Sequence, residues 1–83
     1  MLKKLRHDKS LSQSQLSTGS GVNLKMIQKY EQGVKDINKA KLDTLLKLCN
    51  TLECDLLDII TEPELESLIE TYEIRLKEVR DHG

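Results

Sequence analysis

The chain has 83 residues, a third of which are charged, and a formal net charge of −1 at pH 7. This length allows one small domain with a tail and is too short for the sizeable cleft of most enzymes. No stretch is long and apolar enough for a membrane span, and charged residues rather than an apolar signal segment follow the first residues. We therefore expect a cytoplasmic chain in which the two cysteines, Cys49 and Cys54, stay reduced.

The two halves of the chain carry opposite charge. Residues 1–47 contain ten Lys or Arg and four acidic residues, a net of +6, whereas residues 48–83 contain three Lys or Arg and ten acidic residues, a net of −7. A protein that docks on nucleic acid needs positive charge only on its docking face. The near-neutral total therefore does not exclude nucleic acid, although a charged helical surface can also divide this way by chance.

Two short helices are predicted first. Residues 2–9 form an amphipathic segment in which Leu2 and Leu5 face the core. Ser12 can cap the second helix, and Gln15 completes a capping box with it. We expect this helix to break and fray at residues 19–21, Gly-Ser-Gly, because glycine can adopt the positive φ that ends a helix.

A third helix is predicted from Asn23, which can cap it, to about residue 32, with Gly33 ending it. Its inward side chains are Ile27 and Tyr30, and its other side combines two cations, an amide and one aliphatic group, which is poor core material. The residues of this outer face, spaced i, i+1, i+4 and i+5, are Leu24, Lys25, Gln28 and Lys29. The DNA major groove is read by such groups: cations at guanine or phosphate, an amide at adenine and an aliphatic group at the thymine methyl.

The fourth and fifth helices complete the predicted bundle. The fourth is expected over residues 39–52, with Asn38 as a cap and an apolar stripe of Leu42, Leu45, Leu46, Cys49 and Leu52. Asp55 can cap a short fifth helix over residues 56–60. The spacing of Cys49 and Cys54, C-x4-C without a second pair or clustered histidines, does not indicate a zinc site, and no metal is expected.

The last segment, residues 61–83, differs from the rest. Thr61 and Glu64 can form a capping box for a sixth helix. An apolar seam with the 4-3-4-3 spacing of a coiled coil follows, consisting of Leu65, Ile69, Tyr72, Leu76 and Val79. Two heptads are too few to hold together alone, but a domain this small gains from a partner, which favours self-association into a homodimer. The alternative is an amphipathic helix folded back on its own domain. Arg75 and Arg80 would approach each other in a parallel pair, which slightly favours an antiparallel one.

Several of these motifs together resemble a known family. They are Leu11-Ser12-Gln13, Leu16, Gly21-Val22, Ile27, Glu31-x-Gly33 and Leu45-Leu46-x-Leu48. The chain resembles, over residues 2–60, the helix-turn-helix domain of phage-repressor and Cro-type regulators, also called the xenobiotic-response-element type. The resemblance implies an all-α fold: a five-helix DNA-binding domain over residues 1–60, followed here by the additional amphipathic helix of residues 61–83.

The resemblance also implies roles for individual residues. Arg6 should form a partly buried ion pair with Glu31, and Gln13 should contact a phosphate. We expect further phosphate contacts from Asn23, Lys35 and Lys39, and base contacts from the outer face of the third helix.

The expected function is that of a sequence-specific, double-stranded-DNA-binding regulator, a repressor, which binds an inverted repeat as a homodimer. The alternative is a protein-binding adaptor or antitoxin-like partner that uses the same fold and works through its C-terminal helix. The sequence contains no phosphate-cradling glycine loop and no recognisable nucleophile–base arrangement. We therefore expect neither enzymatic activity nor a cofactor.

Overall fold

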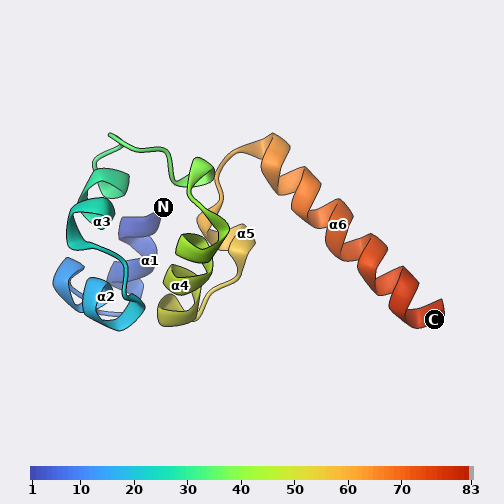
Figure 1. The fold of residues 1–83 in the computed structure, drawn as a ribbon, viewed down its shortest axis with the longest axis horizontal. Coiled ribbons are helices and arrows are strands. Elements are labelled where there is room, and N and C mark those ends of the chain that lie inside the picture. Colours follow the sequence, from blue (N-terminus) through green and yellow to red (C-terminus); the bar gives the residue numbers. More distant parts are fainter. Residues whose placement is uncertain (83) are drawn as a thin grey trace.

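The computed structural model describes residues 1–82, and within them the chain forms six α-helices, one short 3-10 helix and no strand (Figure 1). The first five α-helices make a small bundle, from which the sixth extends as a long arm (Figure 1). The elements are α1 Leu2–Asp8, α2 Gln13–Ser20, α3 Leu24–Glu31, η1 Ile37–Lys39, α4 Leu42–Leu52, α5 Leu56–Ile59 and α6 Pro63–His82.

The core of the bundle is aliphatic, because the chain contains no Phe or Trp. The large side chains that are fully buried come from four helices: Leu16, Ile27, Leu48, Leu52 and Ile59. Burying an aliphatic side chain of this size contributes about 1.5–3 kcal/mol to the free energy of unfolding. The core therefore holds α2, α3, α4 and α5 together through contacts that are far apart in the sequence.

The second helix begins and ends where the sequence predicts, although its last turn is not frayed. The backbone N–H of Gln15 donates to Ser12 Oγ at 3.0 Å, and Gln15 Oε1 accepts from the Ser12 N–H at 2.8 Å, which is a capping box. The predicted break at residues 19–21 is confirmed, because α2 ends at Ser20 and Gly21 supplies the positive φ, of 78°. Ser20 Oγ donates to the Leu16 carbonyl at 2.6 Å, so the last turn is held rather than frayed.

Gly19 has a different role from the one expected. A Cβ at this position would lie 3.0 Å from Cγ2 of Thr51 in α4, which is closer than ordinary van der Waals contact. Glycine therefore allows α2 to approach α4 closely, and Gly21 alone supplies the left-handed conformation that ends the helix.

The fourth helix begins at Leu42, so the predicted start at Lys39 is wrong. Lys39 belongs to η1, where Asp36 Oδ1 accepts from the backbone N–H of Asn38 at 3.0 Å, and extended backbone follows this turn at Ala40 and Lys41.

The apolar stripe of α4 is also displaced from the predicted one. Leu42 and Leu46 are 61% and 46% exposed, whereas Leu48 is fully buried beside Leu45, Cys49 and Leu52. The buried residues 45, 48, 49 and 52 again have the spacing i, i+3, i+4 and i+7, so the face of α4 that meets the core is rotated from the predicted one.

Asn38 joins two segments instead of capping the fourth helix. Its Oδ1 accepts from the backbone N–H groups of Thr61 at 2.7 Å and Glu62 at 3.0 Å, and its Nδ2 donates to Thr61 Oγ1 and to Asp36 Oδ1, both at 2.9 Å. The capping box predicted for Thr61 and Glu64 is therefore wrong, because the N–H and hydroxyl of Thr61 bind Asn38. One carboxamide thus fixes the start of α6 to the loop that follows α3.

Only the first turns of α6 pack against the bundle. Leu65 and Ile69 are half-buried against the core, whereas Tyr72 and Val79 are 64% and 65% exposed. The rest of the helix points away from α1–α5 (Figure 1). The alternative of a C-terminal helix folded back on its own domain is therefore wrong for this structure.

Candidate nucleic-acid interface

The third helix lies at the edge of the bundle, at the opposite end of the molecule from the arm formed by α6 (Figure 1). Asn23 caps it, since its Oδ1 accepts from the backbone N–H of Lys25 at 2.8 Å. Ile27 anchors it, with a side chain that is fully buried in the core. These two contacts fix which side of α3 faces outward.

The outward side of α3 carries the residues that the sequence analysis assigned to base contact. Lys25 and Lys29 are exposed, and Leu24 and Gln28 are half-buried beside them. Each pair is one helical turn apart, so two cations run along the face with an aliphatic group and an amide next to them. This composition matches the donors, acceptors and methyl groups of the major groove.

A buried ion pair ties α1 to the end of α3. Arg6 Nε and Nη2 donate to the Glu31 carboxylate at 2.8 and 2.9 Å, and Arg6 Nη1 donates to the Leu11 carbonyl at 2.8 Å. Their side chains are only 9% and 4% exposed. The hydrogen-bonded guanidinium lowers the pKa of Glu31, and the carboxylate raises the pKa of Arg6.

The same carboxylate holds Gln13, the first residue of α2. Gln13 Nε2 donates to Glu31 Oε1 at 3.2 Å, which orients the amide group beside the start of the helix. The sequence analysis paired Glu31 with Arg6 alone and missed this third partner, because nothing in the sequence signals a contact across 18 residues. One N–H of the Gln13 amide is used here, and the other can donate to a phosphate oxygen.

The loop after α3 places one of its two predicted phosphate contacts against the helix. Lys35 is exposed, and its Nζ lies 3.5 Å from Sδ of Met26 in the first half of α3. Lys39 is also exposed, but it ends η1, where Asn38 binds the start of α6. The structure therefore brings Lys35 together with α3 and places Lys39 on the neighbouring turn.

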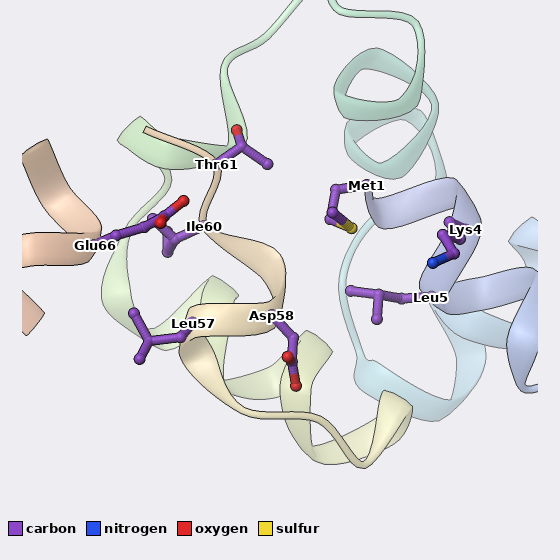
Figure 2. Close-up of a pocket in the computed structure, with 8 residues that line it drawn as sticks. All are labelled: Met1, Lys4, Leu5, Leu57, Asp58, Ile60, Thr61 and Glu66. Carbon is purple, nitrogen blue, oxygen red and sulfur yellow. The ribbon is translucent and has the colours of Figure 1, made fainter. Parts of the chain in front are cut away.

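Other features of the described residues lie outside this face. An open hollow of about 480 Å³ lies between α1, α5 and the start of α6, and Figure 2 shows the residues that line it, among them Met1, Lys4, Leu57 and Asp58. Within residues 1–82 no three His, Cys, Asp or Glu side chains lie close enough to hold a metal ion. Cys49 and Cys54 are free thiols, and in the described part of the chain no helix is both long and apolar enough to cross a membrane.

Comparison with known proteins adds to this geometry. A family model described as the Cro/C1-type HTH DNA-binding domain matches residues 1–63. The chain belongs to this family. The match covers α1 to α5 and ends where α6 of this Cro/C1-type protein begins.

In the Cro/C1-type domain described here, α2 and α3 are the consecutive helices joined by the tight turn at Gly21. The match makes the domain a DNA-binding one, as the resemblance implied. No curated protein and no solved structure matched the chain in the other two comparisons.

Proposed function

We propose that this protein is a sequence-specific transcriptional regulator, a repressor, which binds an inverted-repeat operator as a homodimer with α3 in the major groove. The observation that carries the proposal is the outer face of α3. Its exposed lysines stand on a helix whose opposite side is anchored by the buried Ile27. The family to which the chain belongs is one of DNA-binding domains, and the side chains of this face match the base edges of the major groove.

Each residue of the face has a counterpart on the base edges. Lys25 and Lys29 would donate to guanine O6 and N7, Gln28 would bond to adenine N6 and N7, and Leu24 would contact a thymine methyl group. Lys25 is exposed near the N-terminal end of α3, the end of a recognition helix that contacts base edges. It is therefore our first choice for a specific contact.

A second group of residues would fix the domain on the sugar–phosphate backbone. Gln13 lies at the start of α2, where the N-terminal amides and the helix dipole attract a phosphate. Asn23, Lys35 and Lys39 are the other candidates. Contacts of this kind set the register of the domain but do not read sequence.

The exposed part of the seam of α6 and the symmetry of operators support the proposed homodimer. A dimer of such domains binds two half-sites whose centres are about 34 Å apart, one turn of DNA. The bundle buries only a small core, so a second copy would also add stability.

The test is a selection from random duplex DNA at about 0.15 M salt, where nonspecific phosphate binding is weak. The proposal expects an enriched inverted repeat with the wild-type chain and with the control variant Lys47→Ala, whose substitution lies on the exposed side of α4. It expects loss of the enriched motif with Lys25→Ala combined with Lys29→Ala.

A single enriched half-site would retain the groove assignment and contradict the dimer. No enrichment with protein shown to be folded by circular dichroism would contradict DNA reading altogether. That result would favour the protein-binding adaptor, with α6 as its working surface.

A further inference from the structure

We propose that α6 pairs antiparallel with α6 of a second copy of this chain, so that the C-terminal half of each helix covers an apolar hollow at the root of the other. The pairing rests on the homodimer of the proposed function. It adds the orientation of the two helices, and it assigns an occupant to the hollow.

The hollow lies where α6 leaves the bundle. It measures about 240 Å³, and aliphatic side chains of α4, α5, the segment after α5 and α6 form most of its wall: Leu42, Leu45, Leu56, Ile60, Leu65 and Ile69. Leu42 is 61% exposed although it is a large aliphatic residue. An exposed apolar concavity of this kind is typical of an interaction site.

The hollow is continuous with the seam of α6. Leu65 and Ile69 belong to both, and Tyr72, Leu76 and Val79 continue the same stripe along the exposed part of the helix. A partner that fills the hollow and covers the stripe must therefore be a long apolar ridge about as long as α6. A second α6 has that shape.

The spacing of the seam fits a pair that runs in opposite directions. Relative to Tyr72, the seam residues lie seven and three positions before and four and seven positions after it. This order is nearly the same when it is read backwards. An antiparallel partner centred near Tyr72 therefore brings its Leu76 and Val79 to Ile69, to Leu65 and to the hollow beside them.

Charge also favours the antiparallel arrangement. The first half of α6, residues 63–73, carries four carboxylates (Glu64, Glu66, Glu70 and Glu73) and no Lys or Arg. The second half, residues 74–82, carries Arg75, Lys77 and Arg80 against Glu78 and Asp81. An antiparallel pair sets the acidic half against the basic half twice, whereas a parallel pair sets acidic beside acidic and Arg75 near Arg80.

The antiparallel arrangement also keeps the two bundles apart. A helix of 20 residues is about 30 Å long. In the antiparallel pair the two bundles lie at opposite ends of this rod, so neither blocks the hollow of the other, whereas a parallel pair would place both bundles at the same end.

Thiol cross-linking of single-cysteine additions tests the orientation. Tyr72→Cys, at the centre of the seam, should be cross-linked to its own copy by a short bis-maleimide. Val79→Cys should not, because the two copies of residue 79 lie about 14 residues, or about 21 Å, apart along an antiparallel pair. Val79→Cys mixed with Leu65→Cys should give the cross-linked heterodimer, and Glu66→Cys replaces Leu65→Cys if the latter unfolds.

Two controls accompany the series. Ile74→Cys is 60% exposed like Tyr72 but lies off the seam, so it should stay uncross-linked. The wild type should also remain uncross-linked, because Cys49 is buried and burial raises the pKa of the Cys54 thiol to about 12.

Self-cross-linking of Val79→Cys would overturn the antiparallel orientation, and failure of Tyr72→Cys would show that α6 is not the interface. Both results are independent of DNA. Loss of DNA binding with the antiparallel pattern intact would therefore reject the proposed function alone, and specific DNA binding without the pattern would reject this inference alone.

A charge exchange gives a second readout. Arg80→Glu should weaken an antiparallel dimer about fivefold in sedimentation equilibrium, since it turns two attractive contacts with Glu66 into repulsive ones. Adding Glu66→Lys in the same chain should restore the affinity. A dimer that Arg80→Glu strengthens would instead be parallel, because the substitution would then relieve repulsion from Arg75.

Discussion

Glu31 is the residue on which the geometry of the DNA-facing helices depends. It is the last residue of α3, and its carboxylate accepts two hydrogen bonds from Arg6 of α1 and one from Gln13 of α2. A buried charge pair of this kind adds little net stability compared with apolar packing, but it is costly to break from one side. We interpret the contacts of Glu31 as fixing the positions of α1, α2 and α3 relative to one another.

Replacing one partner of the Arg6–Glu31 ion pair should destabilise the bundle strongly. Glu31→Gln leaves the guanidinium of Arg6 buried without a counter-charge, and the free energy of unfolding should fall by about 3–5 kcal/mol in urea denaturation at pH 7. Glu53→Gln is the matched control, because Glu53 meets Lys9 at 3.4 Å with 75% of its side chain exposed. Its effect should stay below about 1 kcal/mol.

The same pair predicts a pH dependence. Arg6 lowers the pKa of Glu31 in the folded state, so its stabilisation is complete above the unfolded-state pKa, about 4.3, and disappears as the pH falls through the lower folded-state pKa. Wild type should therefore lose more stability than Glu31→Gln between pH 5 and the acid limit of its folding, measured by denaturation at a series of pH values. Parallel curves for the two proteins would contradict this assignment.

Loss of a base contact should weaken binding to some DNA sequences more than to others, whereas loss of a phosphate contact should weaken binding to all of them alike. Lys25→Ala should cost about 1–3 kcal/mol of binding free energy on the selected operator and relax the preference at one base pair. Lys35→Ala should weaken binding to all duplexes alike and reduce the salt slope by about one. Titrations of operator and scrambled DNA over a salt series measure both, and equal behaviour of the two variants would contradict the assignment.

At the scale of elements, α2 and α4 are packed more closely than a side chain at residue 19 would allow. Gly19→Ala introduces a Cβ at 3.0 Å from Thr51 Cγ2. Overpacking costs about 1–3 kcal/mol, which should outweigh the gain of about 1 kcal/mol that alanine brings to a helix. The variant should therefore unfold at a lower urea concentration than wild type.

The sign of this effect should reverse when the neighbour is removed. In a Thr51→Ala background the contact is absent, so Gly19→Ala should then stabilise the protein through its helix propensity alone. The four chains form a double-mutant cycle, measured by urea denaturation. The same destabilisation in both backgrounds would show that Thr51 is not the constraint.

The helices were predictable where their signals are local. Ser12 with Gln15, and Asn23 with the helix after it, were predicted from neighbouring residues, and the structure contains both caps. Asn38 and Thr61 were assigned wrongly because their partners are 23 residues apart. The later start of α4 was missed for a related reason, since residues 37–39 form η1, which the side chain of Asp36 caps.

The candidate site was predictable to a similar degree. The exposed face of α3 follows from spacing and from the buried position of Ile27. The contact of Gln13 with Glu31 and the position of Lys35 beside Met26 depend on how the elements meet, and no pattern within one element could indicate them. The roles of these residues toward DNA stay predictions.

On the scale of the whole molecule, the chain is elongated, measuring 44 × 22 × 20 Å, because α6 projects from the bundle. Its exposed part carries the apolar side chains of Tyr72 and Val79. The candidate DNA face and this arm lie at opposite ends (Figure 1). Reading of DNA and pairing of copies can therefore be altered separately.

Tyr72→Glu should separate the two properties. A carboxylate in the centre of the seam should shift the chain to monomer in sedimentation, while the bundle, which Tyr72 does not help to bury, should stay folded by circular dichroism. Affinity for an operator with both half-sites should fall by at least about 100-fold, and that for a single half-site should not change.

The matched control for this variant is Ile74→Glu, at a position that is 60% exposed and off the seam. It should remain dimeric and keep its affinity for the full operator. If Ile74→Glu and Tyr72→Glu weakened association equally, the seam would not be the contact surface.

The carboxamide of Asn38 fixes the start of α6, so a small change of angle there becomes a large displacement at the far end of the helix. This carboxamide holds Thr61 and Glu62, just before the helix, to the loop that follows α3 through three hydrogen bonds. A tilt of about 10° at that root would move the far tip by about 5 Å, since the helix is about 30 Å long. How firmly Asn38 holds the angle of α6 would thus determine how far the distance between two half-sites can vary before the dimer no longer binds both.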